Sequence, residues 1–397
     1  MRIVLMFEVH QPVRLRLYEG RTRGLKEFVE KWFDWSLSQE VIERASKKCS
    51  IPANNILLEE VLRARDQGRE FKVSMSLSGV LVDQLRRFMP EALESFRRLV
   101  KEGDVELLGQ TYYHSLASLF SELKEFREQV KMHSRVMRKE FGFTPKVFEN
   151  TEFIYNDEIA EEVKRMGFKA ILTEGAERVL GWRSPTYLYS APNGLKLLMR
   201  HYRLSDDVGF RFSNREWEHW PLTADKYAGW LSNLQGQFVL LAMDYETFGE
   251  HHWPESGIYE FLRHLPREAF RRGLDFAYPS EVAALEPADV VSIPREATLS
   301  WADIDKGIGA WAGNAMQRAA LREVEELGRV AKGEKARHVW RLLQISDHFH
   351  YMFTGSGGPQ EVHGYFSPFK DPLMAFITYM RALLSFIKAV KKPTSRT

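Results

Sequence analysis

The sequence contains very little cysteine and almost no net charge. Cys49 is the only cysteine among 397 residues, which excludes an internal disulfide and a metal or redox site of the CxxC type. The 56 lysines and arginines nearly balance the 54 aspartates and glutamates, so no chain-wide basic field indicates a nucleic-acid partner. Hydrophobic residues make up 44% of the chain and charged residues 28%, a balance typical of globular proteins with a large core.

Long hydrophobic runs are also missing. Residues 1–12 contain a short apolar run that is followed at once by Glu8 and His10, whereas a signal peptide needs a longer apolar segment and a small-residue cleavage site. The sequence has no run of about 18 apolar residues of the kind that spans a membrane. We therefore expect a cytoplasmic protein that has neither a membrane nor a nucleic acid as its partner.

Aromatic residues, by contrast, are abundant, at 13% of the chain with 10 tryptophans. A well-filled core accounts for this content, and so does a cleft lined with flat apolar faces. Sugar rings stack on such faces through their C–H sides, so the composition is compatible with a carbohydrate site.

Short apolar runs alternate with amphipathic helical patterns over most of the chain. The runs cover residues 3–7, 71–77, 105–108, 146–148, 170–172, 195–199, 238–243 and 274–278. Continuous apolar runs are typical of parallel strands that are buried on both faces and covered by helices. We therefore predict an α/β fold with a β/α barrel over residues 1–290.

The pattern changes after Pro294. Residues 308–330, 336–352 and 371–390 have the spacing of long helices, with no strand pattern between them. We predict that residues 291–397 form a helical domain that packs on the barrel.

Polar residues gather directly after the predicted strands, at the ends where a parallel barrel carries its chemistry. They occupy positions 8–12, 109–114, 149–152, 173–174 and 244–253. Asp244 is the most informative of them, because a charged residue directly after a buried strand is costly unless it faces a polar cleft. This clustering predicts an active site at the carboxyl ends of the strands.

Two carboxylates that face each other across a cleft are the groups needed for glycoside hydrolysis. One is protonated and donates to the leaving oxygen, while the other is ionised and attacks the sugar or activates water. The spacing of the residues alone does not choose between Glu149 and Glu152, or between Asp244 and Glu246.

Five sequence blocks together resemble glycoside hydrolase family 57, in particular its α-amylase-like branch. The blocks are HQP at 10–12, GQTYYHSL at 109–116, NTEFIYND at 150–157, MDYETFGEHHW at 243–253 and LSWADIDKGIGAWAGNAMQ at 299–317. They follow the order of the family and extend over nearly the whole chain. The resemblance implies an incomplete (β/α)7 barrel followed by a helical domain.

The resemblance also implies a retaining mechanism on α-1,4-glucans or maltooligosaccharides. It assigns the nucleophile to Glu152 and the general acid/base to Asp244. If water accepts the glycosyl group the enzyme is an α-amylase, and if a sugar hydroxyl accepts it the enzyme is a 4-α-glucanotransferase. The sequence leaves this choice open, together with the linkage and the length of the glucan.

Further polar and aromatic residues of these blocks are candidates for substrate binding. Histidines are candidates for hydrogen bonds to sugar hydroxyls, Glu246 for orienting Asp244, and tryptophans for stacking on sugar rings. The candidate set is His10, Gln11, His114, Glu246, His252, Trp253 and Trp301, with Asp347 and His348 from the helical region. We expect no metal and no cofactor.

One position departs from the family pattern. Relatives often carry an acidic residue just before the Ala310-Trp311 pair, where this chain has Gly307. The departure keeps open a non-catalytic glucan-binding or regulatory protein on the same barrel. A metal-dependent deacetylase or mannosidase is a more remote alternative, because no helical HxxxH pair follows a strand end and because His251 and His252 are adjacent.

Overall fold

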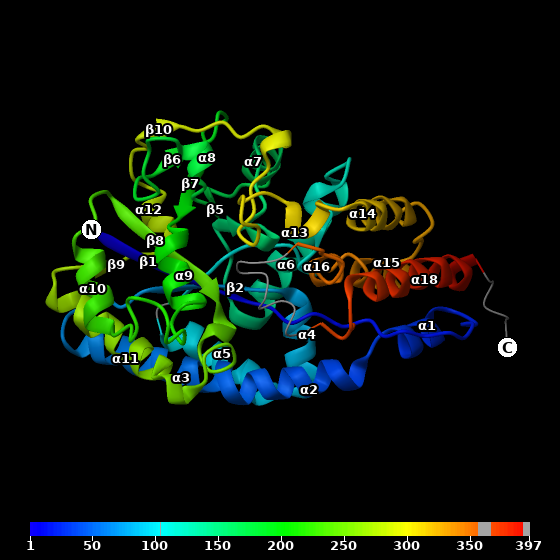
Figure 1. Ribbon diagram of the computed structural model, residues 1–397, viewed down its shortest axis with the longest axis horizontal. Helices are drawn as coiled ribbons and strands as arrows, with labels where there is room; N and C mark the ends of the chain where they lie inside the picture. Colours follow the sequence, from blue (N-terminus) through cyan, green and yellow to red (C-terminus); the bar gives the residue numbers. More distant parts are fainter. Residues whose placement is uncertain (104, 356–366, 392–397) are drawn as a thin grey trace.

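A ring of parallel strands forms the centre of the computed structural model, which describes residues 1–103, 105–355 and 367–391 (Figure 1). The strands are β1 (Arg2–Val9), β2 (Val73–Leu77), β3 (Val105–Leu107), β4 (Val147–Glu149), β5 (Ala170–Glu174), β7 (Lys196–Arg200) and β8 (Phe238–Asp244). β1 pairs with β2 on one side and with β8 on the other. The predicted α/β fold and its barrel strands are confirmed.

Two neighbouring pairs of strands in the ring share very few hydrogen-bonded residues. A single bridge between Gly109 and Phe148 links the chain after β3 to β4, and β7 meets β8 only through the pairing of Arg200 with Leu240. Three short strands add to the sheet: β6 (Tyr189–Ser190) pairs with β7, β10 (Asp289–Val290) pairs with β6, and β9 (Asp275–Phe276) pairs with the start of β1. This arrangement agrees with the expected incomplete barrel.

The strands are mostly apolar because both of their faces are buried. In β1, Val4 and Met6 belong to one hydrophobic cluster, while the alternating Ile3, Leu5 and Phe7 belong to another. Alternate residues of a strand point to opposite faces, so a strand that is buried on both faces carries apolar residues on each of them. This double burial explains the continuous runs in the sequence.

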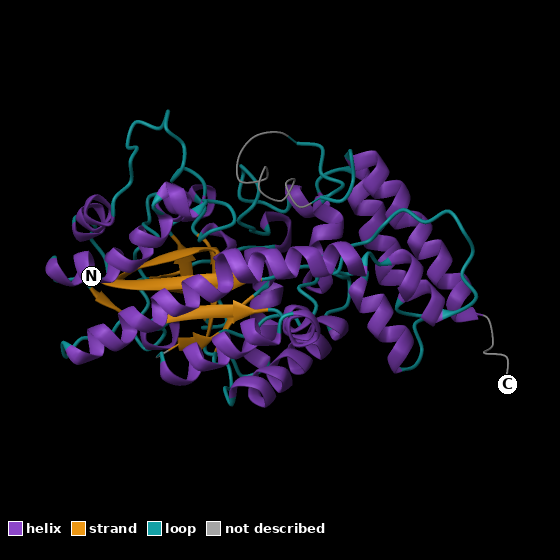
Figure 2. Cartoon of the chain, turned by 90° about the horizontal axis from the view of Figure 1, so that it is seen from below, coloured by secondary structure: helices purple, strands orange, loops and turns teal. Residues whose placement is uncertain are grey.

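Helices cover the outside of the ring, as Figure 2 shows around the strands. They are α2 (Trp35–Ala45), α3 (Ile51–Asp66), α4 (Gly79–Phe88), α5 (Pro90–Glu102), α6 (Lys124–Phe141), α7 (Asp157–Arg165), α8 (Glu177–Leu180), α9 (Tyr202–Gly209), α10 (Ala224–Ser232), α11 (Ile258–Arg271) and α12 (Pro279–Val282). A π-helical turn, Ser46–Ser50, joins α2 to α3.

The C-terminal part is helical, but its helices are shorter than predicted. Residues 308–330 form α13 (Gly309–Ala312) and α14 (Ala315–Leu327), while residues 336–352 contain α15 (Glu334–Leu342) and α16 (Ser346–His350). The first break occurs because Asn314 caps α14, and the second because Ile345 is extended and pairs with Ser115. α18 (Pro372–Lys391) is one long helix, as expected.

The N-terminal α1 (Leu25–Trp32) joins this helical part, where it lies beside α18 (Figure 1). Phe28 of α1 packs edge-on against Phe386 of α18, with 5.8 Å between the ring centroids. The boundary between two domains near residue 290 stays a prediction.

α18 is long and apolar enough, by length and composition, to cross a membrane. The expectation that the protein has no membrane as its partner stays a prediction. The finding is weak evidence, because the core helix of a soluble protein passes the same test. Several α18 residues, among them Tyr379, Leu383 and Phe386, are buried against the neighbouring helices.

Candidate active site

Polar side chains from several strand ends converge on one cleft of about 470 Å³. Glu8 ends the apolar part of β1 and stands opposite Asp244 in the register between β1 and β8. Glu152 follows β4 in a short 3₁₀ turn (Thr151–Phe153), and His114 follows β3. The lining consists of Glu8, His10, Gln11, Pro12, Arg14, His114, Glu152, Asp244, Glu246, His251 and Asp347.

Glu152 is held by both its backbone and its carboxylate. Its φ of 60° lies in the left-handed region, which is costly for a residue with a side chain and persists only where neighbours enforce it. The Trp301 indole donates to Oε2 at 2.8 Å, and the Ser346 hydroxyl donates to Oε1 at 2.9 Å. Hydrogen bonds to a carboxylate favour its charged form, so this environment suits an anionic Glu152.

His114 lies between two carboxylates. Its Nε2 is 3.0 Å from Glu8 Oε1 and 3.1 Å from Glu152 Oε1, while its Nδ1 is 3.0 Å from Gln110 Oε1. Burial alone lowers the pKa of His114, but the charges of Glu8 and Glu152 outweigh it and raise that pKa well above the usual value. A protonated His114 therefore balances part of the negative charge in the cleft.

Glu8 and Glu246 flank Asp244 with carboxyl groups that resist ionisation. Burial raises the pKa of Glu8 to about 8, and the charges of Glu152 and Asp244 add to the rise while His114 opposes it. Burial and the charge of Asp244 likewise raise the pKa of Glu246 to about 8. Gln11 donates to Glu246 at 2.9 Å and accepts from Arg14 at 2.8 Å, which fixes the side chain of Glu246.

His10 connects the barrel to the helical part. Its Nδ1 is 2.7 Å from Ser78 Oγ, its Nε2 is 3.2 Å from Asp347 Oδ2, and its ring stacks on that of His114 with 4.0 Å between centroids. Burial, followed by the charge of His114, lowers the pKa of His10 to about 4. The ring of His10 is therefore neutral at neutral pH and holds Asp347 at the edge of the cleft.

Most of the predicted site residues come together in this cleft. Its lining contains Glu152, Asp244, His10, Gln11, His114, Glu246 and Asp347. Of the two glutamates between which the sequence does not choose, Glu152 lines the cleft, whereas Glu149 is fully buried, accepts from Ser76 at 2.7 Å and lies outside the lining. Asp244 and Glu246 both line the cleft.

Two of the predicted histidines lie outside the lining. His252 is buried, with Nδ1 at 2.8 Å from Ser213 Oγ and Nε2 at 3.1 Å from the Gly209 carbonyl oxygen. Its neighbour His251 lines the cleft instead. His348 lies with Nε2 at 3.1 Å from the Leu342 carbonyl oxygen, and its pKa is lowered to about 4, mainly by burial.

The two predicted tryptophans have different environments. Trp301 is 7% exposed and stacks on Phe153 at 4.7 Å, so one ring face is covered by protein while its N–H contacts Glu152. Trp253 is 64% exposed and lies outside the lining of the cleft. Trp301 lines the second cavity described below, whereas Trp253 lines neither cavity.

The sequence reasoning missed Glu8, His251 and Ser346. Glu8 carries the same signal as Asp244, a charged residue at the end of an apolar run, and that signal would have found it. Ser346 carries no such signal, because it reaches Glu152 only through the break between α15 and α16.

Glu8, His114 and Glu152 are also a potential metal-binding group within the described part of the chain. Each offers one ligand atom, and these atoms lie within 4.8 Å of one another. A metal ligand needs an unprotonated nitrogen, whereas the two carboxylates favour a protonated His114. The geometry fits an ion-pair cluster well and a metal site less well.

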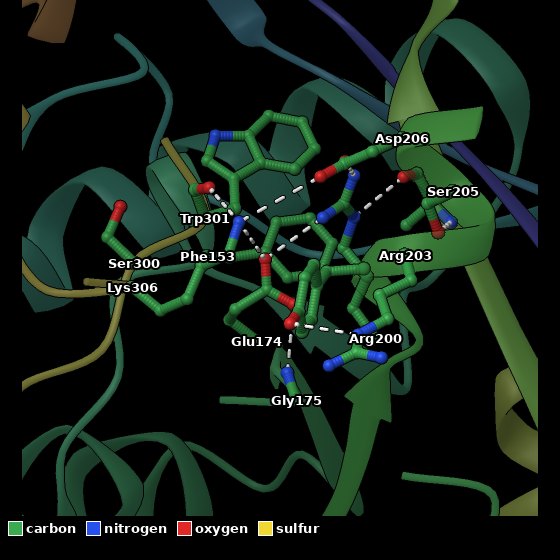
Figure 3. Close-up of polar contacts among 12 residues, drawn as sticks. Phe153, Glu174, Gly175, Arg200, Arg203, Ser205, Asp206, Ser300, Trp301 and Lys306 are labelled. Carbon is green, nitrogen blue, oxygen red and sulfur yellow. Dashed lines mark hydrogen bonds and ion pairs between the residues drawn. The ribbon is translucent and has the colours of Figure 1, made fainter. Parts of the chain in front are cut away.

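A second cavity, of about 370 Å³, lies on the other side of Asp244. Its lining consists of Arg200, Asp206, Gly209, Phe210, Met243, Asp244, Thr247, Trp301 and Ala302. Asp244 is common to both cavities, whereas Glu152 lines only the first. Figure 3 shows the buried charged residues behind this second cavity.

The family model named Glycosyl hydrolase family 57 matches residues 4–294 of this chain. The chain belongs to glycosyl hydrolase family 57. It is thus a glycoside hydrolase, and the family suggested by the five sequence blocks is confirmed. A Methanocaldococcus jannaschii protein whose name proposes an alpha-amylase is 44% identical over 405 residues, covering 99% of this chain and 85% of that protein.

Solved structures of family 57 enzymes share the fold. The 4-alpha-glucanotransferase from Thermococcus litoralis matches with a TM-score of 0.67 and 17% identity, over 98% of this chain and 59% of the other. A branching enzyme from Thermococcus kodakaraensis matches with a TM-score of 0.66 and 14% identity, over 98% of this chain and 91% of the other. At these identities the likeness shows the fold alone.

Proposed function

We propose that this family 57 enzyme is a retaining α-glycosidase that acts on α-1,4-glucans, with Glu152 as nucleophile and Asp244 as general acid/base. The observation that carries the proposal is the meeting of these two carboxylates, from the ends of β4 and β8, in one cleft. The names of the relatives, among them an alpha-amylase and a 4-alpha-glucanotransferase, support glucan as the substrate class.

In the first step, Glu152 attacks the anomeric carbon while Asp244 gives a proton to the departing oxygen. The bond between the anomeric carbon and that oxygen breaks as the bond to Glu152 forms. Retaining chemistry expects carboxyl groups about 5–5.5 Å apart. The donors on Glu152 suit an anionic nucleophile. Asp244 lies between Glu8 and Glu246, whose own pKa values are raised to about 8.

In the second step, Asp244 acts as a base. It takes a proton from water or from a sugar hydroxyl, whose oxygen then displaces Glu152 from the anomeric carbon. His10 and Asp347 at the rim suit hydrogen bonds to sugar hydroxyls, and the exposed Trp253 suits stacking on a further ring.

The second cavity suits the sugar on the far side of the scissile bond, which an α-amylase releases and which a 4-α-glucanotransferase, the second candidate, replaces by an acceptor. Asp244 lines both cavities and Glu152 lines only one, so we propose that the scissile bond crosses from the first cavity into the second. The sugar attached to Glu152 then occupies the first cavity, and the leaving or accepting sugar occupies the second. Product analysis on defined maltooligosaccharides separates the two activities, since transfer yields longer chains and hydrolysis yields only shorter ones.

Substitution of the two carboxylates tests the proposal directly. We expect Glu152→Gln and Asp244→Asn each to lower kcat on maltooligosaccharides by roughly a thousandfold or more, because each removes a whole chemical role. Glu158→Gln is a matched control, since Glu158 is exposed on α7 and pairs with Arg295. Equal activity of the wild type and both site variants would refute the assignment.

Two further measurements address the alternatives. A non-catalytic glucan-binding protein would bind maltooligosaccharide without turning it over. A metal-dependent deacetylase or mannosidase would contain stoichiometric metal and would lose its activity on chelation. We expect turnover that chelators leave unchanged.

A further inference from the structure

A short turn after the barrel, residues 300–306, contacts Glu152 at several atoms. The Ser300 hydroxyl donates to the Glu152 carbonyl oxygen at 2.7 Å, and the Trp301 indole donates to the carboxylate at 2.8 Å. Trp301 also stacks on Phe153, whose own φ is 55°. The same turn therefore holds the left-handed backbone of Glu152 and its carboxylate.

Lys306 ends this turn and points into the protein (Figure 3). Its φ of 54° is unfavourable for a residue with a side chain, and its backbone closes the turn, because Ser300 N–H donates to the Lys306 carbonyl oxygen at 3.1 Å. The buried ammonium group donates to the Trp301 carbonyl oxygen at 3.2 Å. Lys306 is thus bonded to the residue that holds the carboxylate of Glu152.

The ammonium group of Lys306 also reaches two buried carboxylates of the barrel wall. Its Nζ lies 3.7 Å from Glu174 Oε2, at the end of β5, and 3.9 Å from Asp206 Oδ2, in α9. Arg200, at the end of β7, donates to the same two carboxylates at 2.9 and 2.5 Å. The two cations balance the two anions, so the loss of Lys306 would leave a buried excess negative charge.

We propose that Lys306 is a positioning residue for Glu152, which fixes the 300–306 turn to the barrel wall so that Trp301 and Ser300 stay on the nucleophile. The proposal rests on the proposed role of Glu152. It also bears on the departure in the fifth sequence block. Relatives often carry an acidic residue at the position of Gly307, whereas in this chain the neighbouring Lys306 places a positive charge in the wall of the site. A Cβ at Gly307 would find its nearest neighbour, Arg178 Nη2, at 3.8 Å, so space alone does not require glycine there.

Lys306→Met tests the proposal, because it keeps the length of the side chain and removes the charge. We expect kcat to fall by roughly 10- to 100-fold with little change in KM, the size expected when a hydrogen bond to a charged group is lost. Lys306→Arg retains the charge and should recover a large part of kcat.

Lys72→Met is the matched control. Lys72 also pairs with two carboxylates, Glu70 at 2.7 Å and Glu281 at 2.8 Å, at the start of β2, away from the cleft. It should lower stability and leave kcat within about twofold. If Lys306→Met does not fold, Glu174→Gln replaces it as the test. Glu174 is a partner of Lys306 and lines neither cavity, and we expect its substitution to lower kcat to the same extent.

A double-mutant cycle separates positioning from a long-range effect of charge. Trp301→Phe keeps the stacking on Phe153 and removes the N–H donor. If Lys306 acts through Trp301, the double variant should have nearly the kcat of Trp301→Phe alone, well above the product of the two single effects. Both single variants should also move the acidic limb of the kcat profile to higher pH, because a carboxylate that loses a donor binds its proton more tightly.

The outcomes distinguish this proposal from the proposed function. Unchanged kcat in Lys306→Met, or fully multiplicative effects in the double-mutant cycle, would overturn the positioning role of Lys306. An inactive Glu152→Gln would in that case still support Glu152 as the nucleophile. Full activity of Glu152→Gln would instead remove the proposed function itself.

Discussion

At the scale of single residues, the main surprise is how much negative charge gathers around Asp244. Glu8 lies opposite Asp244 in the strand register, and Glu246 follows it by two residues. The sequence could predict that acids end the strands, because a charged group after a buried run has to face a polar space. It could not predict which of His251 and His252 enters the cleft, because both follow the 3₁₀ segment after β8 in an irregular turn whose side-chain directions have no simple period.

The carboxyl group of Glu246 should tune the proton of Asp244. Because the pKa of Glu246 is raised to about 8, its carboxyl group is charged, and repels an ionised Asp244, only above about that pH. Glu246→Gln removes this charge, so the basic limb of the kcat/KM profile should change above about pH 8 and stay in place below it. A pH series of initial rates on a maltooligosaccharide measures this shift. Glu255→Gln, at an exposed position in the same loop, is the control and should leave the limb in place. A basic limb that is identical in wild type and Glu246→Gln would contradict the coupling.

At the scale of elements, the barrel could be predicted because its strands are buried on both faces. All eight apolar runs correspond to strands, from β1 to β9. β6 and β10, of two residues each, were missed because neither lies in one of these runs. The breaks in the C-terminal helices were missed because they depend on tertiary partners, as when Ser346 N–H donates to the His114 carbonyl oxygen at 3.0 Å.

The break between α13 and α14 depends on one asparagine. Asn314 accepts from the Gln317 N–H at 2.9 Å as the cap of α14, and its amide donates to the Met352 carbonyl oxygen at 2.7 Å. We expect Asn314→Ala to lower the free energy of unfolding by about 1–2 kcal/mol, because it removes a cap and leaves a carbonyl unpaired. Chemical denaturation measures the loss. Asn233→Ala, at the exposed end of α10, should cost less than about 0.5 kcal/mol, and an equal cost at both positions would argue against the cap.

At the scale of the whole molecule, buried titratable groups make the free energy of unfolding depend on pH in two opposite ways. His10, His133 and His348 have pKa values lowered to about 4, mainly by burial, against about 6.5 in an unfolded chain. Between these values the unfolded chain binds more protons, so the free energy of unfolding rises with pH. Glu8 and Glu246 have pKa values raised to about 8, so over the range from about 4.5 to 8 the folded protein binds more protons, and they make it fall.

These opposite contributions should cancel in part below about pH 6.5 and leave a decline between about pH 6.5 and 8. Each fully titrating group contributes at most about 1.4 kcal/mol per pH unit. Glu246→Gln should therefore flatten the decline above pH 6.5, whereas His133→Gln, at a buried position that lies outside the lining of both cavities, should change the stability profile only below it. Urea denaturation at a series of pH values measures both slopes. A decline of unchanged steepness in Glu246→Gln would mean that this carboxyl group ionises in the folded protein as it does in the unfolded chain. Glu246 would then no longer count among the carboxyl groups near Asp244 that have a raised pKa. Part of the reason to expect a protonated carboxyl group in the cleft would be lost as well.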